Sequence, residues 1–208
     1  MLTRLGRLAP FTGVVFAVLA LAGMATAQVP PGVKASGDQV LAFARAHASS
    51  QRRADVLLIA GFAFFVFFAG SLRAYLRRSP EGEAASTVAL AGAAVMAGGV
   101  AVYIGLDFAL NSAPDAIAPA AAQALNVLAL RLVFPMSVGG FVFGIAAGVA
   151  ILRSNLLPAW LGWVSIVIAL LTPIWFVQVL VLYVWAVVVS ILLWKRSDMT
   201  KQSSAQTA

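Results

Sequence analysis

The chain has 208 residues, 62% of them hydrophobic and 10% charged, with a mean hydropathy of +0.97. A soluble domain carries roughly a quarter charged residues to coat its surface, so this composition excludes an ordinary water-soluble fold. The net charge of +7 does not indicate nucleic-acid binding, because the basic residues stand at the ends of apolar runs, and the lack of cysteine excludes disulfides and thiolate sites.

The apolar runs are continuous, and most approach the ~20 residues that a helix needs to cross ~30 Å of hydrocarbon. They predict an all-α, polytopic transmembrane helical bundle of about six spans, or five if the first is cleaved. We expect a single membrane domain over residues 1–208 and no soluble domain. The expected spans are residues 8–27, 56–75, 85–106, 132–152, 156–171 and 174–194.

The first run follows Arg4 and Arg7 and ends in the small residues Ala25, Thr26 and Ala27. A basic start, an apolar stretch and a small-residue end are typical of a secretory signal peptide. The run is also long enough to be a retained first helix, and both interpretations stay open. In either case the residues that follow begin outside the membrane.

The segment after the first run is polar and opens with Val-Pro-Pro-Gly at residues 29–32, which predicts an extended turn. Residues 38–50 then place apolar side chains at Val40, Leu41 and Phe43, with Arg45 on another face. This spacing predicts a short amphipathic helix lying on the outer surface of the bilayer.

The second expected span, 56–75, is rich in phenylalanine, which we expect to face acyl chains. Asp55 directly precedes it, in a position suited to cap a helix N-terminus. The third span, 85–106, is dominated by alanine and glycine, and Ala94 and Gly98 form a strip on which another helix could pack. Asp107 marks the end of this span.

Residues 116–130 are ambiguous, because they fit either the start of a long fourth helix or a separate surface helix. Within the fourth span, Gly140, Gly144 and Gly148 recur at every fourth position on one stripe. Glycines at this spacing let another helix approach closely. We expect them to pack inside the chain, with association of two copies as the alternative.

The last two spans are separated by Thr172 and Pro173, because proline interrupts a helix. Positive residues favour cytoplasmic loops, so their distribution predicts the orientation. With both termini in the cytoplasm, and with Arg131 left out of the count, nine positive residues lie inside against four in one loop outside. The nine are Arg4, Arg7, Arg73, Arg77, Arg78, Arg153, Lys195, Arg196 and Lys201, and the four are Lys34, Arg45, Arg52 and Arg53.

Three stretches together resemble a known group of proteins. They are Val-Leu-Ala-Phe-Ala-Arg-Ala-His at residues 40–47, Phe-Ala-Gly-Ser-Leu-Arg-Ala-Tyr-Leu-Arg at 68–77, and the Leu-Pro-x-Trp-Leu-Gly-Trp run at 157–163. The chain resembles a broad group of small, mostly uncharacterised multi-pass membrane proteins of actinomycete-type bacteria. The resemblance implies a bacterial plasma membrane and carries no activity with it.

Arg131 is the most informative charge, because an arginine inside hydrocarbon needs a partner or a function. Its distance from Arg153 is about 22 residues, or roughly 33 Å at helical rise, so it also fits a position at the outer interface. Further polar residues map to the same outer half and are candidates for a ligand site or pathway. These are Asp55, Asp107, Asn126 and Gln178, with Asn111 and Gln123 beside them.

No paired carboxylates, metal-binding spacing or nucleophile motif is present, and His47 is the only histidine. We therefore expect a protein that is not an enzyme and has no metal and no cofactor. The expected function is that of an accessory or structural subunit in the lipid bilayer, with a membrane-protein partner or a second copy. The alternative is a small-solute or lipid-like transporter that uses the outer polar residues. A weaker third reading is an intramembrane enzyme built around Arg131, Asp107 and His47.

Overall fold

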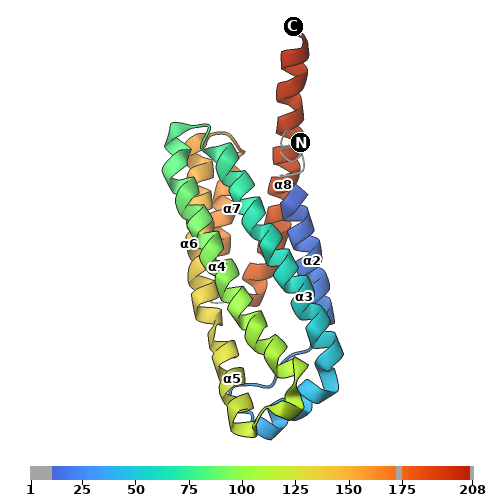
Figure 1. Cartoon of the computed structure of the whole chain (residues 1–208). Helices are drawn as coiled ribbons and strands as arrows, with labels where there is room; N and C mark the ends of the chain where they lie inside the picture. The colour runs from blue at the N-terminus through green and yellow to red at the C-terminus, as the bar shows by residue number, and fades with distance from the viewer. Residues whose placement is uncertain (1–10, 172–174, 207–208) are drawn as a thin grey trace.

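The computed structural model describes residues 11–171 and 175–206, including the side chains of residues 11–171 and 177–196. The described residues form helices and no strand, which confirms the all-α bundle (Figure 1). The elements are α2 (Thr12–Thr26), α3 (Gly37–Leu76), α4 (Pro80–Ser112), the 3-10 turn η2 (Pro114–Ala116), α5 (Pro119–Arg131), α6 (Val133–Ser154), α7 (Ala159–Leu170) and α8 (Trp175–Gln206).

Four stretches are long and apolar enough to cross a membrane, and two shorter helices are apolar as well. The long stretches are Gly37–Leu76, Pro80–Ser112, Pro119–Ser154 and Val177–Arg196, and the shorter helices are Thr12–Thr26 and Ala159–Leu170. By the length and composition of its helices the chain is a membrane protein. The predicted break at Thr172 and Pro173 lies outside the described residues, as do Arg4 and Arg7 of the charge count.

α3 is one helix of 40 residues, which corrects the prediction of a separate surface helix over 38–50. Ser36 begins it with a capping box, because its Oγ accepts from the Gln39 amide at 3.3 Å and the Gln39 side chain accepts from the Ser36 amide at 2.9 Å. The polar stretch 45–55 contains neither glycine nor proline, so nothing interrupts the helix there. At 1.5 Å per residue α3 is ~60 Å long and exceeds the ~30 Å of hydrocarbon.

The part of α3 beyond its apolar stretch packs with the end of α4 and with α5. We call this region, which comprises the first part of α3, the last turns of α4, η2 and α5, the outer layer, after the side of the membrane on which the sequence predicts it. Its small core consists of Val40, Leu41, Leu110 and Ala122. The connection from α2 to α3 is tied to it, because Asn126 Nδ2 donates to the Pro31 carbonyl at 3.1 Å. Residues 116–130, ambiguous in the sequence, belong mostly to α5.

α5 and α6 are separate helices because of a proline in the first turn of α6. Pro135 has no amide hydrogen, so the helical bond from residue 135 to the carbonyl of Arg131 cannot form. The interruption is confined to Leu132, whose amide keeps the helical bond to the Leu128 carbonyl at 3.2 Å and also bonds the Ala129 carbonyl at 3.1 Å. The interruption lies between α5, which belongs to the outer layer, and α6, which continues into the bundle.

An aromatic cluster occupies the centre of the bundle, which corrects the expectation that the phenylalanines of the second span face acyl chains. Phe65 and Phe68 of α3 are fully buried, whereas Phe67 is 66% exposed. Phe65 contacts Phe16 of α2 and Phe143 of α6, with ring centroids 4.9 and 5.0 Å apart. Such pairs contribute about 0.5–1.5 kcal/mol each beyond the burial of apolar area.

Glycines hold α6 close to its neighbours on two sides. A Cβ at Gly144 would lie 2.8 Å from the Ala169 Cβ of α7, and one at Gly148 would lie 2.7 Å from the Gly162 carbonyl oxygen. A Cβ at Gly140 would meet only side chains, 3.4 Å or more away. The predicted stripe of Gly140, Gly144 and Gly148 therefore lies inside the chain, at close range for the last two.

On the other side of α6, the contact with α4 uses glycines that the sequence analysis did not select. A Cβ at Gly92 would lie 2.5 Å from the Phe143 amide nitrogen, and one at Gly139 would lie 2.3 Å from the Met96 nitrogen. Ala94 and Gly98, the expected strip, lie on the exposed face of α4, and a Cβ at Gly98 would meet nothing within 4 Å. The start of α2 and the end of α8 lie at the end of the bundle opposite α5 (Figure 1).

Candidate functional site

Four polar side chains from α3 and α4 come together where the apolar stretches of these helices meet the outer layer. Gln51 and Asp55 are one turn apart on α3, and Asp107 and Asn111 are one turn apart on α4. Residues four apart lie on the same face of a helix, so each helix presents one amide and one carboxyl group. All four side chains are buried, between 2% and 7% exposed. We call them the carboxyl–amide cluster.

Asp107 is the centre of this cluster. Its carboxyl group lies close to the carboxyl group of Asp55 and to the Asn111 side chain. Gln51 Nε2 reaches Asp107 Oδ2 at 3.5 Å, and Asn111 Nδ2 donates to the Asp107 backbone carbonyl at 2.7 Å. Two carboxyl groups share a hydrogen bond only when one of them carries a proton. Because two neighbouring buried carboxylates repel each other, the pair favours one positive charge, a proton or a cation, between the two groups.

Two buried oxygen atoms of the cluster have no hydrogen-bond partner, namely Asp55 Oδ2 and Asn111 Oδ1. Buried polar atoms without a partner are uncommon in native structures and call for an explanation. Asn111 Oδ1 can only accept a hydrogen bond or coordinate a cation, and Asp55 Oδ2 does the same unless it carries a proton, so the cluster lacks a positive or donating group rather than an acceptor.

No basic side chain in the described ranges neutralises the two carboxyl groups. Arg52 and Arg53 flank Asp55 in sequence but are exposed, and their Nε atoms donate back to the α3 carbonyls of Ala48 and Ser49. The ion pair found among the described residues, Arg45 with Asp115 at 2.8 Å, is exposed in the outer layer. The buried negative charge is thus not paired by an arginine or a lysine.

The connection between α2 and α3 also contacts the carboxyl–amide cluster. The backbone amide of Gln28 donates to Gln51 Oε1 at 2.7 Å. Gln51 therefore joins the connection to Asp107, accepting from one and donating to the other. Sequence analysis did not select Gln51, although its position one helical turn before Asp55 was a usable signal once α3 is taken as continuous.

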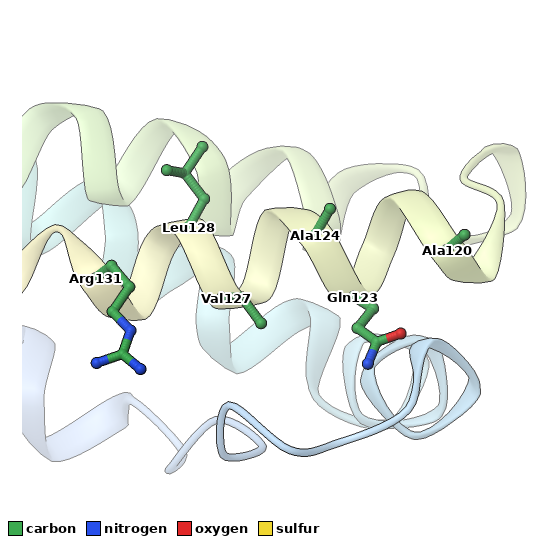
Figure 2. A pocket seen from close by; sticks show the side chains of 6 residues that line it. All are labelled: Ala120, Gln123, Ala124, Val127, Leu128 and Arg131. Atoms are coloured by element: carbon green, nitrogen blue, oxygen red, sulfur yellow. The ribbon is translucent and has the colours of Figure 1, made fainter.

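The other predicted site residues lie elsewhere. Arg131 is exposed at the end of α5, beside an open hollow of about 520 Å³ whose wall also includes Gln123 and Val127 (Figure 2). Asn126 is buried in the outer layer with Pro31 as its partner. Gln178 is buried on α8, where a Cβ at Gly140 would lie 3.6 Å from its Nε2. The expected group of five thus divides, and only Asp55 and Asp107 meet.

His47 has a local role on α3. Its Nδ1 lies 3.0 Å from the Phe43 carbonyl, and its ring packs on the Phe43 ring with centroids 4.5 Å apart. Arg131 is exposed at the end of α5, whereas Asp107 is buried on α4. The described contacts of His47, Arg131 and Asp107 do not include one another, so the structure offers no support for the enzyme reading built on these three.

No protein-family model, curated protein or solved structure matches this chain. The chemistry of the site therefore follows from its own residues: two carboxyl groups and two amides, buried together, with oxygen atoms left unpartnered. Oxygen ligands suit a proton or a small hard cation and do not suit an anion.

Proposed function

We propose that the protein is a non-catalytic integral membrane protein that takes up and moves a small cation through the carboxyl–amide cluster. The observation that carries this proposal is the meeting of Asp55 and Asp107, from two different helices, at a buried place without a basic partner in the described part of the chain. Leaving a buried carboxyl pair uncompensated costs several kcal/mol. Ionisable side chains in membrane helices characteristically belong to ion or proton pathways.

The proposed location is a bacterial plasma membrane with both termini in the cytoplasm. The bacterial address is supported by the resemblance of residues 40–47, 68–77 and 157–163 to proteins of such membranes. The orientation is supported by Arg73, Arg77 and Arg78 at the end of α3, which lies at the same end of the bundle as the end of α8 (Figure 1). The cluster then belongs to the outer half of the molecule.

Proton flux into proteoliposomes tests the function. The protein is reconstituted with a pH-sensitive dye and sodium chloride inside, the liposomes are diluted into sodium-free buffer, and a potential that is negative inside is imposed by potassium diffusion with valinomycin. We expect faster acidification than in protein-free liposomes, and loss of the difference in Asp107→Asn. The control is Asp115→Asn, which changes an exposed aspartate of the outer layer and should keep the flux. Equal rates with and without protein would contradict the proposal.

A second candidate function is that of a structural or accessory component that assembles through α4. The exposed side of α4 carries a seam of small residues, and a row of valines that are 50–55% exposed borders it. The seam is Ala91, Ala94, Gly98, Ala101 and Gly105, and the valines are Val88, Val95 and Val102. The spacing of three and four residues is that of helices crossing at a small angle, and small residues allow close approach in lipid.

The occupant that best fits this seam is a second copy of the chain. Two copies with the same orientation in one membrane are related by an axis along its normal, so their α4 helices run parallel and equal residues meet. Because the chain has no cysteine, Gly98→Cys introduces a single thiol. Oxidation in membranes should give a covalent dimer. Val138→Cys on α6, 59% exposed, is the control and should stay monomeric.

Val138 is a matched position because α4 and α6 are paired at this depth, where a Cβ at Gly99 would touch Met136 and one at Gly139 would touch Met96. Equal cross-linking of both variants would indicate random collision. Cross-linking of Gly98→Cys to neither a second copy nor anything else would remove this candidate.

A further inference from the structure

The ligand of the carboxyl–amide cluster can be narrowed further from its charge and its oxygen atoms. We propose that the cluster binds one sodium ion in exchange for one proton. This inference rests on the proposed function, because it names the ligand of the same site. Its test is a binding measurement, which separates its failure from a failure of transport.

The exchange leaves the buried charge unchanged. In the proton-bound state one carboxyl is neutral and shares its hydrogen with the other, which is ionised. When sodium enters, the O–H bond breaks, the proton leaves to water and both carboxylates face the cation. Each state holds two carboxyl groups and one positive charge, so the net charge is −1 in both. Because a change in buried net charge is expensive, one monovalent ion for one proton is the exchange this site favours.

The unpartnered atoms supply ligands of the right kind. Asp55 Oδ2 and Asn111 Oδ1 are buried oxygen atoms with no hydrogen-bond partner, and the Asp107 carboxyl group contacts both residues' side chains. Hard cations take oxygen ligands. Calcium takes about six to eight oxygen ligands. The Gln51 Oε1 atom already accepts from the Gln28 amide, so the remaining oxygen atoms of Asp55, Asp107 and Asn111 fall short of that set and a monovalent ion fits better.

The charged and titratable surroundings are few on every element that packs here. α2 has no charged residue, and α5 has only Arg131, exposed at its far end. On α3 the neighbours are the exposed Arg52 and Arg53 and, one turn before Gln51, His47. On α4 Tyr103 lies one turn before Asp107, and the connection between α2 and α3 carries the exposed Lys34. None of these is in ion-pair contact with the two carboxyl groups in the described structure. Sodium binding therefore competes with the proton of the pair itself and strengthens as pH rises.

The test is thermal unfolding of the purified full-length protein in detergent, in sodium chloride and in choline chloride of equal concentration. We expect sodium to raise the midpoint by several degrees at alkaline pH, because a ligand that binds only the folded state stabilises it. The rise should vanish at acidic pH and in Asp107→Asn, and persist in Asp115→Asn. Equal midpoints in the two salts for the wild type, or an undiminished sodium effect in Asp107→Asn, would overturn the proposal.

Proton release from the wild-type protein tests the exchange of sodium for a proton even if Asp107→Asn fails to fold. Addition of sodium chloride to weakly buffered wild-type protein should release protons, and choline chloride should not. Release by both salts, or by neither, contradicts the exchange. Sodium binding without proton flux in liposomes would leave this inference standing and remove the transport function. Proton flux without any sodium effect would remove this inference and leave the transport function standing.

Discussion

The effect of a glycine on the stability of this bundle depends on whether its face of the helix packs against another helix. Gly144 faces α7 so closely that an added Cβ would lie 2.8 Å from Ala169 Cβ and 3.0 Å from the Ser165 carbonyl oxygen. Ser165 Oγ also donates to the Gly144 carbonyl at 2.9 Å, so the two backbones are held together by a buried hydrogen bond. Gly98, on the outer side of α4, would meet nothing within 4 Å. The same residue type therefore has opposite consequences in the two helices.

Gly144→Leu is expected to lower the thermal midpoint in detergent, because a larger side chain must push α7 away from α6. Overpacking of this kind costs roughly 1–3 kcal/mol or more. Gly70→Leu on α3, where a Cβ would also meet nothing within 4 Å, is the matched control and should leave the midpoint unchanged or raise it slightly, since glycine is a poor helix former. Equal losses in the two variants would show that the distinction between the two faces is wrong.

The carboxyl–amide cluster also depends on how single side chains are placed. Asp55 and Asp107 were selected from the sequence as lone carboxylates at helix ends, and that position alone suggests a cap. Their meeting depends on the rotation of α3 and α4 about their axes, which local sequence does not specify. Asn126 and Gln178 were selected on the same grounds, but packing places Asn126 against the Pro31 carbonyl and Gln178 next to Gly140 of α6.

At the scale of elements, the length of α3 has the largest consequence. Its polar middle, residues 45–55, contains good helix formers and no breaker, so helix continues from the outer layer into the apolar stretch. Continuity puts Gln51 one turn from Asp55 and on the same face. A surface helix that ended before the second span would have separated them. Pro135 has the opposite effect and separates α5 from α6.

The capping box at the start of α3 should stabilise its outer end. Ser36→Ala removes the acceptor for the Gln39 amide and is expected to cost about 1 kcal/mol, or roughly fivefold faster local opening. Hydrogen exchange of the amides at residues 37–41 measures this. Ser79→Ala is the control for α4, where the preceding serine caps no backbone amide and its hydroxyl donates to the Glu81 side chain. Unchanged exchange after Ser36→Ala would mean that tertiary packing alone holds this end.

At the scale of the whole molecule, the two ends of the bundle differ in chemistry. The end that contains the loop between α3 and α4 carries the basic residues Arg73, Arg77 and Arg78, whereas the opposite end is the outer layer with the Arg45–Asp115 pair. The bundle is held by the aromatic cluster and the glycine contacts between these ends. Orientation in the membrane therefore depends on the charge difference between them.

Single-cysteine labelling checks this orientation, since the natural chain has no thiol to interfere. In intact bacterial cells a membrane-impermeant maleimide should label Ala116→Cys, in the exposed turn η2. Ser79→Cys, in the loop between α3 and α4, should react only after the membrane is permeabilised. The reverse pattern would place the carboxyl–amide cluster on the cytoplasmic side.

Hydropathy and helix length are local properties of the chain, so the amino-acid sequence was enough to predict a helical membrane protein and the positions of its apolar runs. It also indicated the glycine stripe of α6, since spacing along one helix is local too. Tertiary structure alone decided that α3 is continuous, that Ala94 and Gly98 face outward while Gly92 and Gly139 face inward, and that Gln51, Asp55, Asp107 and Asn111 share one buried place. These outcomes depend on how each helix is rotated against its neighbours, and that rotation is set by contacts between residues far apart in the chain.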